Sequence, residues 1–137
     1  MKIKLSVDPY DQWFVRIVVS IGGKTSPVTF KVDNGCNSLV LSHDTLEKLG
    51  VSVDSSILKK LPSKIGRLAS GEKHTFKELG TVSLFRADKQ LTHICNAQAI
   101  CHATRETRDL LGTEIFKQFT DVNFHLSGNK YMELLKH

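Results

Sequence analysis

The chain of 137 residues is of a size typical of one domain, and its 40% hydrophobic and 24% charged residues are ordinary for a globular protein. We therefore expect a single domain over residues 1–137. No apolar stretch is long enough to span a bilayer, and residues 1–7 alternate charged and apolar side chains, unlike a secretory signal. These features predict no membrane partner and a cytoplasmic location, or excision from a larger intracellular precursor.

The net charge of +5 allows weak attraction to acidic partners, but the basic residues are scattered along the chain. Lys59 and Lys60 are the only adjacent pair, and aromatic residues do not alternate with basic ones as a base-stacking surface requires. We therefore expect no nucleic-acid partner.

The first part of the chain predicts three strands. Apolar and polar residues alternate over residues 2–7, and a richer β pattern covers residues 13–21. Gly22 and Gly23 predict a hairpin turn, because glycine accepts a positive φ without steric cost. Residues 25–32 then return as the partner strand.

Proline and glycine predict the next boundaries. Pro27 lacks a backbone N–H, so the start of its strand is expected at a sheet edge. Ser42 is a suitable N-cap for a short helix that ends at Gly50. Residues 51–63 show no regular pattern and are predicted to form a loop.

A small, glycine-containing segment, Ala69-Ser70-Gly71-Glu72, separates the apolar patterns of residues 64–68 and 74–79. This arrangement predicts a hairpin whose tip is either a mobile segment or an ordinary β-turn. The remaining expected elements are a strand at 81–85 after Gly80, a strand at 91–100, a short helix at 113–119, a strand at 122–126 and a strand at 131–135. Many short strands with one or two short helices predict a mostly β fold, a small closed β-barrel.

Asp33-Asn34-Gly35 follows one apolar run and precedes another, Leu39-Val40-Leu41, so it places a carboxylate on a tight turn at the end of a strand. It is the only Asp-x-Gly in the chain. Later, Leu110-Leu111-Gly112 ends a second apolar strand and precedes the expected short helix. In this order the two motifs resemble those of the retropepsin-like aspartic proteases, over roughly residues 13–126.

The resemblance implies a retropepsin (acid protease) fold and an aspartic endopeptidase that acts on a peptide or protein substrate. It implies no cofactor and no metal. It also implies a role for each matching residue: Asp33 is catalytic, Asn34 and Gly35 complete the active-site loop, Ser70 and Gly71 lie in a flap over the substrate, and Leu110, Leu111 and Gly112 support the loop.

Peptide hydrolysis without a covalent intermediate needs one group that takes a proton from water and another that polarises the substrate. Two carboxylates that share a proton do both. The chain supplies only Asp33, so we expect a homodimer that brings two copies together on a two-fold axis. The strands expected at 2–7 and 131–135 could pair between the two chains.

The chain departs from the family pattern at Asn34 and at the pair Asn37 and Thr113. Asn34 stands where the family has Thr or Ser, whose hydroxyl bonds across the dimer axis; the amide can also donate and accept, but it is larger. The alternative function is therefore a catalytically impaired, dimeric binding or scaffolding domain. Asn37 and Thr113 occupy the places of an acidic residue and an arginine of viral members, and can form at most a neutral hydrogen bond.

Histidine and cysteine residues suggest two rival chemistries. His93, Cys95, Cys101 and His102 are close in sequence, but their spacings do not resemble the paired ligands of a zinc site, so we interpret the cysteines as reduced, buried thiols. Cys36 is a candidate nucleophile next to the Asp33 turn, but sequence assigns it no base: neither His43 nor His125 can be placed beside it.

Overall fold

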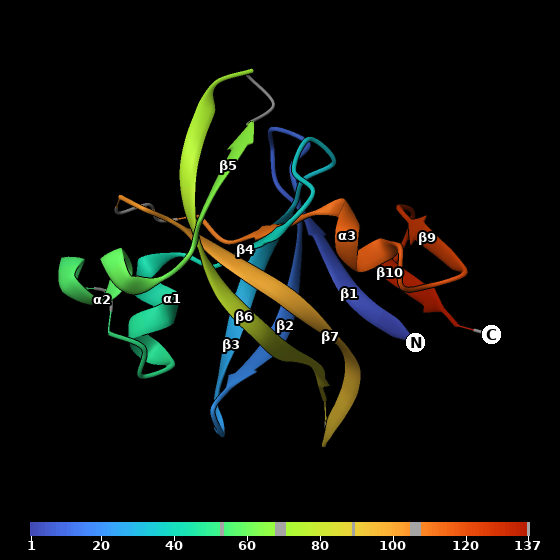
Figure 1. The fold of residues 1–137 in the computed structure, drawn as a ribbon. Coiled ribbons are helices and arrows are strands. Elements are labelled where there is room, and N and C mark those ends of the chain that lie inside the picture. Colours follow the sequence, from blue (N-terminus) through green and yellow to red (C-terminus); the bar gives the residue numbers. More distant parts are fainter. Residues whose placement is uncertain (53, 68–70, 89, 105–107, 137) are drawn as a thin grey trace.

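The computed structural model describes residues 1–52, 54–67, 71–88, 90–104 and 108–136 (Figure 1). Its elements in chain order are β1 (Lys2–Val7), β2 (Trp13–Ile21), β3 (Lys24–Val32), β4 (Leu39–Val40), α1 (His43–Lys48), α2 (Ser55–Lys60), β5 (Ser63–Arg67), β6 (Lys73–Ala87), β7 (Leu91–His102), β8 (Leu110–Leu111), α3 (Thr113–Phe116), β9 (Asp121–His125) and β10 (Tyr131–Leu135). None of the helices in these ranges is both long and apolar enough to span a membrane.

Six strands of the described residues close into a barrel, in the order β6-β7-β4-β8-β3-β2, and the pairing of β2 with β6 completes the ring. Two neighbouring pairs, β3–β8 and β4–β7, are parallel, so the barrel is mixed. The β5–β6 hairpin projects from one end, and β1, β10 and β9 continue the sheet beyond β2 (Figure 1). The prediction of a mostly β, barrel-like fold is confirmed.

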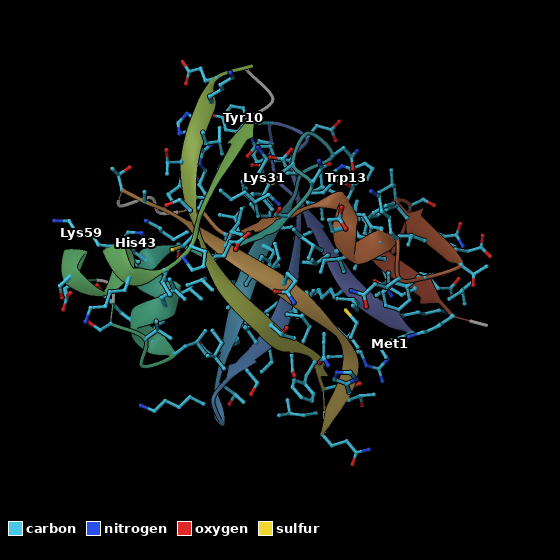
Figure 2. The ribbon with its side chains drawn as sticks, in the orientation of Figure 1. Met1, Tyr10, Trp13, Lys31, His43 and Lys59 are labelled. Atoms are coloured by element: carbon cyan, nitrogen blue, oxygen red, sulfur yellow. The ribbon has the colours of Figure 1, made fainter. Side chains whose placement is uncertain are left out.

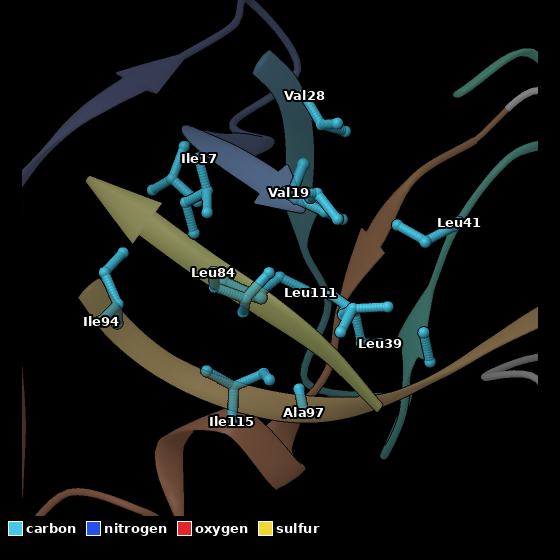
Figure 3. Close-up of a cluster of buried hydrophobic side chains, with 14 of the residues drawn as sticks. Ile17, Val19, Val28, Leu39, Leu41, Leu84, Ile94, Ala97, Leu111 and Ile115 are labelled. Atoms are coloured by element: carbon cyan, nitrogen blue, oxygen red, sulfur yellow. The ribbon is translucent and has the colours of Figure 1, made fainter. Parts of the chain in front are cut away.

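The core lies inside this barrel. Ile17 and Val19 of β2, Leu84 of β6 and Leu111 of β8 converge on one interior, and each is at most 1% exposed (Figure 3). Burial of a side chain of this size stabilises the folded state by about 1.5–3 kcal/mol. The barrel is therefore a rigid base for the loops that leave its end.

The expected strands at 2–7, 13–21, 25–32 and 131–135 are confirmed as β1, β2, β3 and β10. Pro27 lies opposite Val18 of β2, whereas β8 pairs with β3 only at Lys31 and Val32. The start of β3 is thus an edge, as proline at this position predicts.

The predicted helix near Ser42 is also confirmed, as α1. The Ser42 Oγ accepts a hydrogen bond from the N–H of Thr45 at 3.1 Å. Gly50 ends the helix at a φ of +76°, and its N–H donates to the carbonyl of Glu47. A positive φ of this kind is readily adopted by glycine, which explains the stop.

The prediction of a loop over residues 51–63 is wrong, because it contains α2. Asp54 accepts a hydrogen bond from the N–H of Ser56 at 2.9 Å and so caps the helix, while Leu58 is 6% exposed and anchors it to the core. The described residues therefore hold three helices, where one or two were expected. A helix of six residues is too short for its hydrophobic periodicity to be recognised in the sequence.

Gly80 does not separate two strands as predicted. It lies within the long strand β6 at a φ of +87°, where the pairing with β7 shifts register between Glu78 and Gly80. Glycine inside a strand can mark such a bulge as well as a break, and here it bends a continuous strand.

The helix expected at 113–119 is shorter, because α3 ends at Phe116. Residues 117–119 continue as turns, in which the N–H groups of Gln118 and Phe119 donate to carbonyls three residues earlier.

The terminal strands pair with each other within the chain. Lys2–Lys4 of β1 lie opposite Tyr131–Glu133 of β10, and the N–H of Leu134 donates to the carbonyl of Met1 at 2.8 Å. The expectation that these strands pair across a dimer needs correction, because each already has a neighbour in its own chain. Among the described strands, β9 is left with β10 as its one partner.

Asp109, which precedes β8, fastens α1 to the barrel. One carboxylate oxygen accepts from the N–H of Ser42 at 2.7 Å, and the other accepts from the Oγ1 of Thr45 at 3.0 Å. Its backbone carbonyl accepts from the N–H of Lys31 in β3 at 3.0 Å. Burial raises the pKa of the Asp109 carboxyl group, although these hydrogen bonds oppose the shift.

We predict that Asp109→Ala lowers the free energy of unfolding by about 1–3 kcal/mol, because the buried N–H of Ser42 loses its partner. Asp109→Asn, which keeps an acceptor oxygen, should cost less. Because the folded-state pKa of Asp109 is raised, the folded chain takes up the proton first. The wild type should therefore gain stability relative to Asp109→Asn as the pH falls from above the folded-state pKa towards the unfolded-state pKa.

Urea unfolding of the three proteins at neutral and mildly acidic pH measures both effects. An unchanged gap between the wild type and Asp109→Asn would contradict the pH dependence.

Candidate active site

Asp33 stands directly after β3, on a turn that its own side chain stabilises. Its Oδ1 accepts a hydrogen bond from the N–H of Gly35 at 2.9 Å, and its carbonyl accepts from the N–H of Cys36 at 3.3 Å. Asp33 is half-buried, whereas Asn34 and Gly35 are exposed. The predicted geometry, a carboxylate on a tight turn at a strand end, is present.

The second sequence motif lies against this turn. Strand β8 is inserted between β3 and β4: Leu111 pairs with Val32 on one side and with Leu39 on the other. The N–H of Asp33 donates to the carbonyl of Leu111 at 3.0 Å, which extends the pairing of β3 and β8 up to the carboxylate. The motifs at residues 33–35 and 110–112 are thus in contact, as the resemblance implied.

The backbone of Gly112 passes so close to the backbone of the Asp33 loop that a side chain at position 112 would not fit between them. A Cβ at this position would lie 2.5 Å from the carbonyl oxygen of Ser38 and 2.6 Å from that of Cys36. The next residue, Thr113, donates its N–H to the same Cys36 carbonyl at 3.0 Å. Residues 33–38 are therefore held in shape by the backbone of residues 111–113.

A neutral side-chain hydrogen bond reinforces the crossing. The Oγ1 of Thr113 donates to the Oδ1 of Asn37 at 3.2 Å, and the N–H of Glu114 donates to the Asn37 carbonyl at 2.8 Å. The prediction of a neutral bond between Asn37 and Thr113 is confirmed.

The β5–β6 hairpin projects at the end of the barrel where the Asp33 loop lies (Figure 1). Its two strands pair in register from Ser63 opposite Lys77 to Arg67 opposite Lys73. Of the two residues predicted for the tip of a flap, Gly71 has a φ of +86°, whereas Ser70 lies outside the described residues. The hairpin itself is confirmed, and its position suits a segment that covers the Asp33 loop.

A groove of about 1060 Å³ begins beside the Asp33 loop at Asn37 and Ser38. It runs along β6 and β7 to α3. The exposed side chains that line it are polar and carry both charges: Lys64, Glu78, Asn96, Gln98, Glu114, Lys117 and Gln118. Its apolar lining residues include Leu79, Ala97 and Ile115, of which Ala97 and Ile115 are buried in the core.

Cys36 does not have the environment of a nucleophile. Burial raises the pKa of its thiol, and the nearby Asp33 charge raises it further, so the thiolate is disfavoured. Its Sγ donates to the carbonyl of Ser38 at 3.4 Å. The two candidate bases are engaged elsewhere: the ring of His43 bonds the His102 carbonyl, and His125 stacks on a tyrosine of β10.

The four residues considered as metal ligands are dispersed. His93 is exposed, whereas Cys95 and Cys101 belong to the barrel core, and His102 packs against the ring of Phe76. All three cysteines are unpaired, so the interpretation of Cys95 and Cys101 as buried thiols is confirmed. Cys36 is only half-buried. Within the described ranges, no group of three or more His, Cys, Asp or Glu side chains is arranged to hold a metal ion.

No sequence-family model matches the chain, and no characterised protein matches it by sequence. Among solved structures, it is similar to the crystal structure of a retropepsin-like aspartic protease from Rickettsia conorii, with a TM-score of 0.58. The match covers 98% of this chain and 90% of that chain. The chain has a retropepsin-like fold. At 16% sequence identity, the likeness of this retropepsin-like chain to that protease shows the fold alone.

Phe76 is a residue near the Asp33 loop that sequence analysis did not single out. It belongs to a small apolar cluster against which Cys36 of the loop packs. One apolar residue in a long strand gives no sequence signal that distinguishes it from an ordinary core residue. Only the register of β5, β6 and β7 brings it to the loop.

We predict that Gly112→Ala destabilises the protein by about 3 kcal/mol or more, because the new methyl group would meet two backbone carbonyls that cannot move independently. The φ of Gly112 is −90°, which any residue can adopt, so the cost is steric.

Gly128→Ala is the matched control. Its Cβ would meet nothing within 4 Å, and only its φ of +66° opposes the change, at a cost of about 1 kcal/mol. Urea denaturation compares the two variants; similar losses would show that Gly112 does not hold the loop.

Proposed function

We propose that the protein is an aspartic endopeptidase in which Asp33 and its copy in a second chain activate a water molecule. The observation that carries the proposal is the setting of Asp33. Its carboxylate lies on a partly exposed turn that backbone contacts with Leu111, Gly112 and Thr113 hold in place. The chain that carries this turn has a retropepsin-like fold.

The chemistry requires two carboxylates close enough to share one proton. The ionised partner takes a proton from water while the protonated partner donates to the substrate carbonyl, so that attack and polarisation occur together. Asp109 and Glu114, the carboxylates on either side of the second motif, are both engaged: Asp109 bonds Ser42 and Thr45 through its two oxygens, and Glu114 pairs with Lys117 at 3.4 Å. We therefore propose that the second group comes from another copy of Asp33.

A two-fold dimer satisfies this requirement if the turns meet at the axis. Asn34 and Gly35 are exposed, and Asn34 makes no side-chain hydrogen bond with any residue that the structure describes, so it is free to contact its copy. Strands β1 and β10 pair with each other within one chain, so the proposed dimer does not require them to form a sheet shared by two chains. Among the described strands, β5 and β9 are the two ends of the sheet order, and β9 is the one outside the hairpin that could make further contact between protomers.

The groove beside Asn37 and Ser38 supports a polypeptide substrate. Its lining residues run from Asn37 and Ser38 of the Asp33 loop across β6 and β7 to α3, and its exposed polar side chains offer hydrogen-bond partners to a peptide. An extended peptide that crosses Asp33 could continue into this groove.

A second candidate function rests on one residue. Asn34 is larger than the Thr or Ser of the motif that it resembles, and two copies at a symmetry axis would crowd each other. A retropepsin-like dimer that binds other proteins without cleaving them would retain the fold and the groove but lack turnover.

We predict that Asp33→Asn abolishes hydrolysis of a denatured protein across acidic to neutral pH and leaves the fold intact, because the carboxylate transfers protons and its turn is exposed. Asp88→Asn, an exposed carboxylate at the other end of β6, is the matched control and should remain active. Cleavage products are measured by gel electrophoresis, and the fold by circular dichroism.

Cleavage by Asp33→Asn would remove Asp33 from the mechanism. Loss of wild-type activity on addition of a chelator would instead favour a metal. A wild type that cleaves nothing, but forms dimers, would support the binding domain.

We predict that Asn34→Thr tightens the dimer or raises turnover by about tenfold, because each chain regains a small hydroxyl that donates and accepts, and each hydrogen bond contributes about 0.5–1.5 kcal/mol. Sedimentation gives the dimer dissociation constant, and one peptide substrate gives turnover. Asn129→Thr, at an exposed asparagine before β10, should change neither quantity. Weaker association and slower turnover would mean that Asn34 forms cross-axis bonds of its own.

A further inference from the structure

The β5–β6 hairpin directs one large side chain towards the Asp33 loop. Phe76 of β6 is 3% exposed and packs with Val40, Ile100 and Leu110 in a small apolar cluster, against which Cys36 of the loop also packs. This cluster is separate from the core inside the barrel. The phenyl ring therefore fills the apolar space between the hairpin and the loop.

The cluster lies on the face of the sheet that carries Asp33. Leu110 is directly opposite Lys31 in the β3–β8 pairing, and residues paired in this way share a face. Side chains alternate along a strand, so Asp33, two positions beyond Lys31, belongs to the same face. Cys36 joins the two, because its backbone N–H bonds the Asp33 carbonyl while its side chain contacts the cluster.

Two neighbours fix the position of the ring. A Cβ at Gly66 of β5 would lie 2.9 Å from the Phe76 ring, so the ring occupies space that a side chain at Gly66 would take. On the other side, the rings of Phe76 and His102 are 4.5 Å apart, and the His102 carbonyl is bonded by the ring of His43 at 2.8 Å. The phenyl ring is thus held by β5 and β7 together.

We propose that Phe76 is a specificity-determining residue, which fills the apolar pocket beside Asp33 and restricts the substrate side chain directed there to a small one. The inference rests on the proposed endopeptidase function. An extended peptide that crosses Asp33 presents alternate side chains to this face. A pocket already packed by a phenyl ring accepts glycine, alanine or serine more readily than leucine or phenylalanine. The substrate class is therefore a polypeptide with a small residue at one fixed position near the cleaved bond.

The test compares the wild type with Phe76→Ala and Phe76→Leu. Leu91→Ala is the matched control, because Leu91 is an apolar residue that is 52% exposed and pairs with Ala87 at the end of β6 and β7 far from the hairpin. Each protein is incubated with acid-denatured serum albumin, and mass spectrometry identifies the bonds that are cut.

We expect the wild type to show one position near the cut that is occupied by small residues. Phe76→Ala should raise the share of leucine, methionine and phenylalanine there by about tenfold, since a few methylene groups in an apolar pocket discriminate by at least this factor. Phe76→Leu should raise it less, and Leu91→Ala should not change it.

Different outcomes would contradict the specificity role of Phe76 and the proposed endopeptidase function. If the wild type cuts albumin but both Phe76 variants cut at the same positions, Phe76 is only a packing residue and the specificity inference is wrong. If no protein cuts, the endopeptidase function fails and the inference falls with it. If Phe76→Ala does not fold, Phe76→Leu decides, because it must shift the preference in the same direction.

Discussion

The close crossing of Gly112 over the Asp33 loop is the constraint on which the active site depends. A strand end alone would leave Asp33 on a flexible turn, because one side-chain bond to Gly35 cannot fix six residues. The inserted strand β8 supplies the remaining restraints: it pairs with both β3 and β4, and its continuation contacts the backbone of the loop from Cys36 to Ser38. This arrangement orients the carboxylate before any partner or substrate arrives.

The barrel makes that crossing possible. Parallel pairing of β3 with β8, and of β4 with β7, brings segments that are distant in the chain to one end of the ring. Lys31, which lies opposite Leu110 in this pairing, is labelled in Figure 2. Asp109 joins the same end to α1 through Ser42 and Thr45, so a helix, two strands and a loop share one set of buried hydrogen bonds. Apolar burial stabilises the ring, and the polar contacts determine where its loops lie.

The hairpin and the loop meet through side chains and not through sheet pairing. Phe76 reaches the Asp33 loop from β6, and the small cluster around it is distinct from the barrel core. The hairpin can move with the loss of fewer backbone hydrogen bonds than a strand of the ring. Its outer strand, β5, pairs with β6 alone among the described strands. The Asp33 loop is therefore fixed by backbone contacts, whereas we expect the projecting hairpin to have a lower local stability.

The sequence by itself determined the strands with alternating patterns, the cap at Ser42, the stop at Gly50, and the two motifs that contain Asp33 and Gly112. Each of these is set by local chemistry: side-chain period, a hydroxyl acceptor, or a φ that favours glycine. Only the tertiary structure decided that the terminal strands pair within the chain, that Gly80 bends a strand without ending it, and that Phe76 lies beside the loop. These features depend on register between distant segments, which no local pattern encodes.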